Sequence, residues 1–275
     1  MIKVSIITIN LNNMNGLIKT VESVVQQSYT NFEYIVIDGG STDGSKEYIS
    51  SRVSKFAYWA SEADTGIYAA MNKGLLQAKG EYCLFLNSGD WLLQHDILEN
   101  VFSKCHAEDV LICGCQISTG GSIVNTLSPP TKISLLSILK NSIPHQATFI
   151  KKELFELTGL YSESYKIHGD FEFWLRTIIL KNCSVAALDI VVSNYNLEGI
   201  SASSVNEKLS RKEVDTILNY TFPVRVLADY EHWKTYEAEM EIMNWVKSKQ
   251  IFYQPIRLLY KMASGLNALN KKVFS

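Results

Sequence analysis

The sequence predicts an α/β fold, in which a mostly parallel sheet is flanked by helices and followed by a helical C-terminal extension. Short apolar runs rich in β-branched residues alternate with segments of helical spacing through the first 115 residues. These runs are apolar on both faces, as expected where helices cover both sides of a parallel sheet. After residue 205 the apolar pattern is helical.

The first part of the chain contains five predicted strands, at residues 4–9, 34–37, 56–60, 82–86 and 110–113. Helical spacing begins at Leu17 between the first two strands. The Ser-Thr-Asp run at residues 41–43 predicts the cap of a helix through residue 49. A further helix fills residues 67–78 and ends at Gly80. Right-handed crossovers between parallel strands predict that their carboxyl ends share one edge of the sheet.

The pattern loosens after residue 115. Gly120-Gly121 predicts a hairpin between residues 116–118 and 122–126. The remaining predicted elements are a helix at 133–139, a strand at 146–150, helices at 151–157 and 170–180, one or two strands within 185–196, a Gly/Ser-rich loop at 197–204, and two or three helices within 205–270. These lengths fit one large domain with an appendage.

Composition excludes some classes of function. The chain has 275 residues, of which 47% are hydrophobic and 20% charged, and its net charge of −2 argues against nucleic-acid binding. The charge is uneven, since residues 242–275 contain six Lys or Arg and no Asp or Glu. No run of about 18 apolar residues predicts a membrane span, and the start of the chain does not resemble a signal peptide. Five cysteines without metal-site spacing are typical of a reducing cytoplasm, with Cys113 and Cys115 as buried thiols rather than a redox pair.

Polar or acidic residues follow four of the predicted strands. Asn10, Asp38, Asp64 and Asp90 each lie at or just beyond a strand end. Ligands of open α/β sheets bind outside the carboxyl ends of the strands, so these side chains predict a site for a nucleotide and a metal ion. Asp38 can accept a hydrogen bond from a ring N–H of a base, or it can shape a turn.

Two further pairs of residues, and a metal-binding role for Asp90, extend this candidate site. Asn72 and Lys73, about two turns into the third predicted helix, can reach a ribose and a diphosphate, although Lys73 is equally well explained as a solvated charge. Asp90 is the candidate ligand for Mg²⁺ or Mn²⁺, with Asn87 as a weaker oxygen ligand; its alternative role is a helix cap. His145 and His168 can contact phosphate or acceptor, or serve structure alone.

Asp170 begins a helix with an apolar stripe that includes Trp174. A carboxylate there can act as a general base toward an acceptor hydroxyl, or simply cap the helix. The residues alone do not distinguish Asp170 from Glu172, although helical spacing points Glu172 in another direction.

Five stretches in this order resemble the inverting family-two glycosyltransferases of the GT-A fold, in particular bacterial members that build O-antigen, capsule or colanic acid repeat units. They are residues 4–10 (Val-Ser-Ile-Ile-Thr-Ile-Asn), 36–45, 61–74, 85–90 and 168–176. The resemblance covers residues 1–205. It implies a catalytic domain with a nucleotide-sugar half (1–115) and an acceptor and base half (116–205), followed by the extension at 206–275.

The resemblance also implies roles for single residues. Asp38 would bind the base, Asp64 would support the nucleoside, and Thr8 and Asn10 would line the same pocket. Asp90 would bind Mn²⁺ or Mg²⁺, and Asp170 would be the catalytic base. Trp174, with His145 and His168, is a separate candidate for contact with acceptor or phosphate. Two positions depart from the family: Asn87-Ser88-Gly89-Asp90 replaces the usual Asp-x-Asp, and Gly169-Asp170 stands where Glu-Asp is frequent. The loop at 197–204 resembles a segment that closes over the donor.

The resemblance implies a donor such as a UDP-hexose and a polyprenyl-diphosphate-linked saccharide acceptor. Residues 251–262 combine aromatic and aliphatic side chains with Arg257 and Lys261, a pattern that suits the surface of an anionic bilayer or a helix packed on the domain. The expected location is the cytoplasm, at the inner face of the bacterial cytoplasmic membrane. The alternative functions are a sugar nucleotidylyltransferase and a non-catalytic nucleotide-sugar-binding component.

Overall fold

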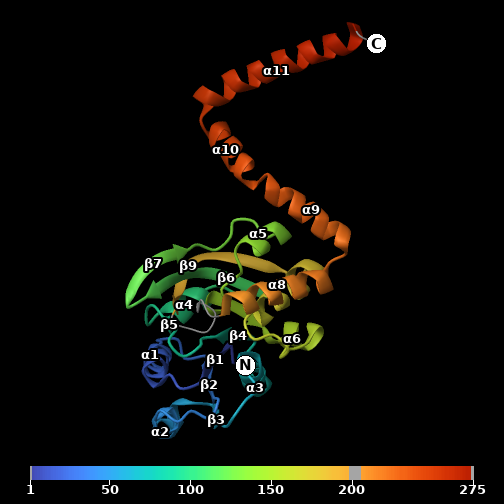
Figure 1. Ribbon diagram of the computed structural model, residues 1–275. Coiled ribbons are helices and arrows are strands. Elements are labelled where there is room, and N and C mark those ends of the chain that lie inside the picture. Colours follow the sequence, from blue (N-terminus) through green and yellow to red (C-terminus); the bar gives the residue numbers. More distant parts are fainter. Residues whose placement is uncertain (1, 198–205, 274–275) are drawn as a thin grey trace. The chain divides into compact units, whose positions relative to one another are not determined.

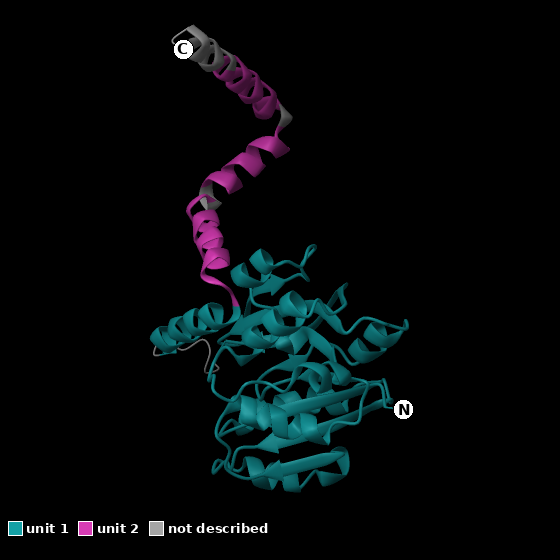
Figure 2. Cartoon of the chain, turned by 90° about the vertical axis from the view of Figure 1, so that its right-hand side faces the viewer, with its two compact units in different colours: residues 1–221 teal, residues 222–275 magenta. Residues whose placement is uncertain are grey.

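The computed structural model describes residues 2–197 and 206–273. The chain forms two compact units, Met1–Thr221 and Phe222–Ser275, shown in different colours in Figure 2. The first unit holds the sheet and its helices, and the second is helical. The predicted α/β fold with a helical extension is confirmed.

Four parallel strands form one side of the sheet. They are β1 (Val4–Asn10), β2 (Phe32–Asp38), β3 (Tyr58–Ser61) and β4 (Tyr82–Phe85), in the spatial order β3-β2-β1-β4. The register pairs Asn10 with Asp38 and Asp38 with Ser61. The last residues of three strands therefore lie side by side, as the predicted crossovers require. The predicted strand at residues 56–60 is shifted by two residues at its start, because η1 (Val53–Lys55) fills the turn before it.

The sheet continues with strands of mixed direction in the order β4-β8-β6-β9-β5, and β7 pairs with β6. Their bounds are β5 (Trp91–Leu92), β6 (Val110–Thr119), β7 (Ser122–Leu127), β8 (Thr148–Lys151) and β9 (Val185–Asn196). β8 runs antiparallel to both β4 and β6. Its first residue therefore lies toward the carboxyl end of β4. The predicted hairpin around Gly120-Gly121 is confirmed as β6 and β7.

Alternate side chains of the parallel strands bury opposite faces of the sheet, as the period of two requires. Val4, Ile6 and Val36 belong to a core cluster with Leu17 and Val21 of α1 (Met14–Val25). On the other face α3 (Ile67–Gln77) approaches closely: a Cβ at Gly74 would lie 2.5 Å from Ile7 and 3.3 Å from Ile37. Figure 1 shows both helices flanking β1 and β2.

The other helices of the first unit are α2 (Ser45–Ser50), α4 (Ile97–Phe102), α5 (Leu135–Lys140), α6 (Lys152–Thr158), α7 (Gly169–Trp174) and α8 (Glu207–Thr221), with the short turn η2 (His145–Ala147). The predicted helix at 170–180 changes to a π-helix, η3 (Leu175–Leu180), after α7. The predicted cap of α2 at residues 41–43 is wrong, since Gly44 is the N-cap with a φ of 95°. Asp43 instead accepts hydrogen bonds from the backbone N–H groups of Met14 and Ser45.

The second unit contains α9 (Val224–Thr235), α10 (Glu237–Ser248) and α11 (Gln250–Val273). With α8, the described part of the chain after residue 205 therefore holds four helices, rather than two or three. The compact units divide after Thr221 and not at 205, because α8 buries Glu213 and Ile217 within the first unit. Among the described residues, the helices lack the combination of length and apolar character that a membrane span needs.

Candidate active site

Asp38, at the end of β2, is the best satisfied carboxylate of the predicted nucleotide pocket. One oxygen accepts hydrogen bonds from Asn10 Nδ2 (2.7 Å) and Ser41 Oγ (2.6 Å), and the other accepts from Ser41 N (3.0 Å) and Ser61 Oγ (2.7 Å). Burial opposes its ionisation, but these hydrogen bonds outweigh burial and hold the pKa of Asp38 below its usual value. Its charge therefore organises the ends of three strands.

Asn10 gains a free acceptor from this arrangement. Because the ionised Asp38 can only accept, the amide nitrogen of Asn10 must face it. Asn10 Oδ1 is then buried, and the described residues supply no donor for it. A buried acceptor without a partner costs about 1–3 kcal/mol, so this oxygen is suited to a donor group on a ligand.

Asp64 lies over the two glycines that follow Asp38. A Cβ at Gly39 would be 2.8 Å from Asp64 Oδ2, and a Cβ at Gly40 would be 3.1 Å from the backbone nitrogen of Ala63. Gly40 also has a φ of 81°, which favours glycine. The close approach of these two segments places Asp64 beside Asp38 at the same edge of the sheet, as predicted.

Three residues predicted to touch the nucleotide have other partners. Thr8 is fully buried below the rim and its hydroxyl hydrogen-bonds to Tyr34 OH at 2.9 Å. The amide of Asn72 binds the backbone of Tyr161 through both its nitrogen (2.9 Å) and its oxygen (3.0 Å). Lys73 forms an ion pair of 2.8 Å with Glu62. The helix turns the amide of Asn72 inward, and the hydroxyl of Thr8 lies below the rim with Tyr34 as its partner.

The loop after β4 is fixed by a hydroxyl of α1. Thr20 Oγ1 accepts from Gly89 N at 3.0 Å and donates to the backbone oxygen of Asp90 at 2.6 Å. Gly89 has a φ of 104°, in the region that favours glycine. The turn therefore favours glycine just before Asp90, which accounts for the absence of a carboxylate at position 89.

Asp90 is 4% exposed and lies in an environment that opposes its charge. Burial raises the pKa of Asp90 to about 7, although hydrogen bonds from Asn196 N and the Gln146 side chain and the proximity of His145 act in the opposite direction. A cation would favour the charged form of such a carboxylate.

The residues around Asp90 fit a hard divalent ion only in part. Asn87 Oδ1 is buried and finds no hydrogen-bond donor among the described residues, so the loop offers one amide oxygen besides the carboxylate. Within residues 2–197 and 206–273 no three His, Cys, Asp or Glu side chains gather as a metal cage. Mg²⁺ binds through one or two carboxylates together with substrate phosphates, and Asp90 with Asn87 fits that mode.

His145 connects this loop to Asp170. It lies in η2, just before the reversed strand β8, and Nδ1 is 3.1 Å from Asp170 Oδ2. Its Nε2 is 3.3 Å from Asn87 Nδ2. Since a carboxylate accepts, Nδ1 carries a proton and donates to Asp170, while Nε2 faces the Asn87 amide. His145, predicted to contact phosphate or acceptor, is thus placed between the candidate metal ligand and the candidate base.

Asp170 has fixed partners on both oxygens. Oδ1 accepts from Tyr68 OH (3.0 Å) and from Phe171 N (2.9 Å), and Oδ2 faces His145. Burial acts against its charge, but the hydrogen bond and favourable electrostatics of His145, followed by Tyr68, lower the pKa of Asp170 below its usual value. Glu172 instead pairs with Arg176 at 2.8 Å. Asp170 is therefore the carboxylate that the site positions.

Tyr68 explains the glycine at position 169. A Cβ on Gly169 would lie 2.8 Å from three atoms of the Tyr68 ring, so the tyrosine occupies the space of a side chain there. The hydroxyl of the same tyrosine lies between Asp170 Oδ1 (3.0 Å) and Ile167 O (2.7 Å), which share its one proton. Tyr68 was not among the predicted site residues, although it lies in the motif at residues 61–74.

Two residues predicted to contact the acceptor or phosphate have other partners in the structure. Trp174 is fully buried, and its indole donates to Ile143 O at 3.0 Å, so it is a core residue of α7. His168 Nε2 lies 2.7 Å from Ser210 Oγ of α8 and is therefore engaged with that helix. The loop predicted at 197–204 lies outside the described residues from 198 onward.

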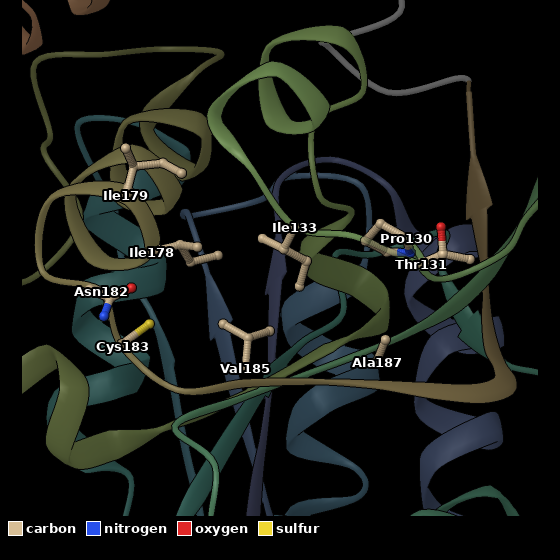
Figure 3. A pocket seen from close by; sticks show the side chains of 9 residues that line it. All are labelled: Pro130, Thr131, Ile133, Ile178, Ile179, Asn182, Cys183, Val185 and Ala187. Atoms are coloured by element: carbon tan, nitrogen blue, oxygen red, sulfur yellow. The ribbon is translucent and has the colours of Figure 1, made fainter. Parts of the chain in front are cut away.

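A hollow of about 450 Å³ lies elsewhere, between the segment before α5, the end of η3 and the start of β9 (Figure 3). It is lined by Pro130, Thr131, Ile133, Ile178, Ile179, Asn182, Cys183, Val185 and Ala187. None of these residues is acidic or basic, and none belongs to the network around Asp90 and Asp170. A charged donor would find no counter-charge in this lining, so the hollow is separate from the candidate site.

Comparison with known proteins identifies the family of the chain. Residues 5–159 match the model of "Glycosyl transferase family 2". An uncharacterized glycosyltransferase of Mycobacterium tuberculosis is 34% identical over 206 residues, which cover 72% of this chain and 77% of that protein. A PGL/p-HBAD biosynthesis glycosyltransferase of Mycobacterium tuberculosis is 28% identical over 215 residues, covering 74% of this chain and 80% of the relative.

Solved structures show the same fold. S. aureus TarS 1–349 in complex with UDP-GlcNAc superposes with a TM-score of 0.60 and 23% identity, over 74% of this chain and 61% of that one. The mannosyltransferase PcManGT from Pyrobaculum calidifontis, in complex with GDP-Man and Mn²⁺, gives a TM-score of 0.55 and 15% identity, over 73% and 58% of the two chains. The match thus spans less than two thirds of either solved chain. From the matched sequence and the GT-A architecture, the chain belongs to glycosyl transferase family 2 and is a glycosyltransferase.

Proposed function

We propose that the protein is an inverting glycosyltransferase that moves a hexose from a nucleotide-sugar, with a UDP-sugar as the leading candidate, to a hydroxyl of a saccharide acceptor. The observation that carries the proposal is the position of Asp170, an ionised carboxylate held by Tyr68 and His145. The same network reaches Asn87 and so connects the base with the loop of Asp90. A base and a candidate metal site in one network suit displacement of a nucleoside diphosphate by a hydroxyl.

The hydrogen bonds of Asp170 select the oxygen that would accept the proton. Oδ1 already accepts from Tyr68 and from Phe171 N, whereas Oδ2 faces only His145 among the described residues. A carboxylate oxygen has two lone pairs, so Oδ2 retains one for the acceptor hydroxyl. In the proposed step this hydroxyl gives its proton to Oδ2 while its oxygen attacks the anomeric carbon from the face opposite the diphosphate. The carbon–diphosphate bond breaks, and the configuration inverts.

Asp90 and the oxygen of Asn87 would hold the divalent ion, Mn²⁺ or Mg²⁺. When bound, such an ion neutralises charge on a diphosphate leaving group. On the other side of the rim, Asn10 Oδ1 is placed to accept from a ring N–H of the base. Asp38 would keep Asn10 in that orientation, and Asp64 would support the nucleoside. The binding of UDP-GlcNAc by TarS supports a uridine nucleotide.

Thermal shift in the presence of UDP-, GDP- and dTDP-sugars, each with and without Mn²⁺, tests the donor class. We expect the largest stabilisation with a UDP-sugar plus Mn²⁺, because a ligand that binds only the folded state stabilises it by mass action. Asn10→Ala should reduce this shift, whereas Asn125→Ala on the exposed hairpin strand β7 should not. If all three donors stabilise the protein equally, or if no donor stabilises it, the proposed recognition of the uridine nucleotide is contradicted.

The acceptor proposed is a saccharide on a polyprenyl diphosphate, in the synthesis of a bacterial surface polysaccharide. A relative named as a PGL/p-HBAD biosynthesis glycosyltransferase supports a biosynthetic role. The second unit supports a membrane surface, since Trp245, Ile251, Ile256, Leu259 and Tyr260 are exposed large apolar side chains on α10 and α11. They occur together with Arg257 and Lys261 in a stretch that has no acidic residue.

Replacement of both Arg257 and Lys261 by Glu is expected to lower co-sedimentation with vesicles that contain anionic lipid. Each basic residue near such a surface contributes about 1 kcal/mol, so the change from two positive to two negative charges should lower partitioning by more than tenfold. Deletion of residues 250–275 should lower it further. A charge-matched control is the replacement of Lys152 and Lys46 of the first unit by Glu. Unchanged partitioning of the tail variants would exclude α11 as the anchor.

A further inference from the structure

The carboxylate of Glu213 on α8 binds three successive backbone N–H groups. Oε1 accepts from Lys166 N at 2.7 Å, and Oε2 accepts from Ile167 N and His168 N, both at 3.0 Å. Glu213 is 7% exposed, and an acidic side chain is rarely so buried without partners. The partners here are all main-chain donors, so the carboxylate fixes the conformation of the loop rather than that of one side chain.

This loop leads directly into α7, which carries Asp170 two residues after His168. From the other side, Tyr68 OH lies 2.7 Å from Ile167 O and 3.0 Å from Asp170 Oδ1, and these two acceptors share its single proton. The peptide at Ile167 is therefore held at its N–H by Glu213 and at its C=O by Tyr68. Tyr68 OH also contacts Asp170, the candidate base. A shift of the loop at residues 166–168 would therefore move Asp170 relative to Tyr68 and His145.

Ser210, one turn before Glu213 on α8, provides a second attachment. Its hydroxyl lies 2.7 Å from His168 Nε2. The two contacts lie on one face of α8, as expected for residues three apart on a helix. Asp170 and α8 both lie beyond the segment matched by the family model, which ends at residue 159.

We infer that Glu213 is a positioning residue for the transfer reaction: through the backbone of residues 166–168 it sets the place of Asp170. The inference rests on the proposed role of Asp170 as the base. This role gives α8 a part in catalysis. The sequence alone predicts residues 206–275 only as a helical extension of the catalytic domain. Glu213 does not contact the reacting groups in this arrangement, so its effect should be on kcat and not on donor binding.

Glu213→Gln is the primary test. The amide keeps the shape, but its nitrogen donates and would oppose at least one of the three N–H groups. We expect kcat to fall by about 10²-fold, the effect of a small misplacement of a catalytic group, with the donor KM unchanged within a few-fold. Glu207→Gln is the matched control, since Glu207 lies on the same helix, is exposed and pairs only with Arg211 among the described residues.

Three measurements distinguish this role from simple support of the fold. Rates are normalised to the folded fraction from circular dichroism, so a loss that follows unfolding alone would overturn the inference. If Glu213→Gln does not fold, Ser210→Ala and Glu213→Asp replace it, and a normal kcat in both would also overturn it. In the Asp170→Asn background, Glu213→Gln should add little further loss, whereas additive losses would place its effect elsewhere. An inactive wild-type enzyme would instead reject the proposed function.

Discussion

Asp170→Asn is expected to lower kcat by about 10²–10⁴-fold, the usual contribution of a general base, while the affinity for UDP stays within a few-fold. The amide is nearly isosteric and can still accept from Tyr68, but it cannot take up the acceptor proton. Steady-state transfer assays and direct UDP titration separate the two effects. The result would place proton removal at this side chain without loss of donor binding.

Glu172→Gln is the matched control for this variant, because Glu172 lies on the same helix and was the alternative base in the sequence. Its pairing with Arg176 predicts nearly normal turnover. If instead Glu172→Gln were inactive and Asp170→Asn retained substantial turnover, the base would have to be reassigned.

The pKa of Asp170 adds a pH dependence to the same prediction. Since the pKa is lowered, the carboxylate stays ionised at neutral pH, and kcat should fall only below the usual titration range of Asp. Tyr68→Phe removes one donor, so it should raise this pKa and move the acid limb of kcat to higher pH. An acid limb that does not move would contradict the support of Asp170 by Tyr68.

Asp90→Asn is expected to have two opposite effects: loss of the metal-dependent part of UDP binding and a gain in stability above pH 7. The first follows because Asp90 is the sole carboxylate that the described residues place at the candidate metal site. It is measured by UDP titration with Mn²⁺ and with chelator. Metal dependence that persists in the variant would move the ion to another site.

The gain in stability follows from the raised pKa of Asp90. In the unfolded chain this carboxyl has its ordinary pKa of 3.8, but in the folded protein its pKa is about 7. Between these values the unfolded state holds fewer protons, so stability falls as pH rises and the loss is complete above pH 7. A tenfold change in proton affinity corresponds to about 1.4 kcal/mol, so the full effect is on the order of 4 kcal/mol.

Urea unfolding of wild type and variant at pH 4 and pH 8 measures this difference directly. Asp109→Asn is the control of opposite sign: burial is outweighed there by hydrogen bonds from Ser184, which lower its pKa, so its loss should reduce stability at neutral pH. A variant at position 90 that is less stable than wild type at pH 8 would show that the carboxylate is compensated in the apo protein. Proton release on addition of Mn²⁺ below pH 7 is an independent check.

The strand ends of the sheet could be predicted from sequence because each depends on local pattern. An apolar run followed by Asp38 or Asp64 predicts a place in a parallel sheet, and the register then brings the two together. How far a side chain lies from the edge of the sheet is harder to predict from the sequence. Thr8 and Asn10 have the same parity and both were predicted to line the pocket, yet Thr8 lies two residues below the edge and binds Tyr34.

Contacts between distant segments account for most of what the sequence did not reveal. Tyr68 and Asp170 are separated by 102 residues, and Glu213 lies 45 to 47 residues after the N–H groups it binds. No periodicity indicates such pairs, and a glutamate in an amphipathic helix is normally solvent-exposed. The partner of Asn72 is also distant in the sequence: its amide hydrogen-bonds to the backbone of Tyr161, which the sequence does not reveal. Asn72 is therefore predicted from sequence as a ligand contact.

The reversed direction of β8 has a consequence for locating functional residues in sheets of this kind. In the parallel strands, the residues that matter for the ligand come after the strand in the chain. In a strand that runs the other way, the same edge is met by the residues before it, which is how His145 comes to stand beside Asn87. In a related chain, candidate site residues are therefore expected before the antiparallel strand that corresponds to β8 and after the parallel strands.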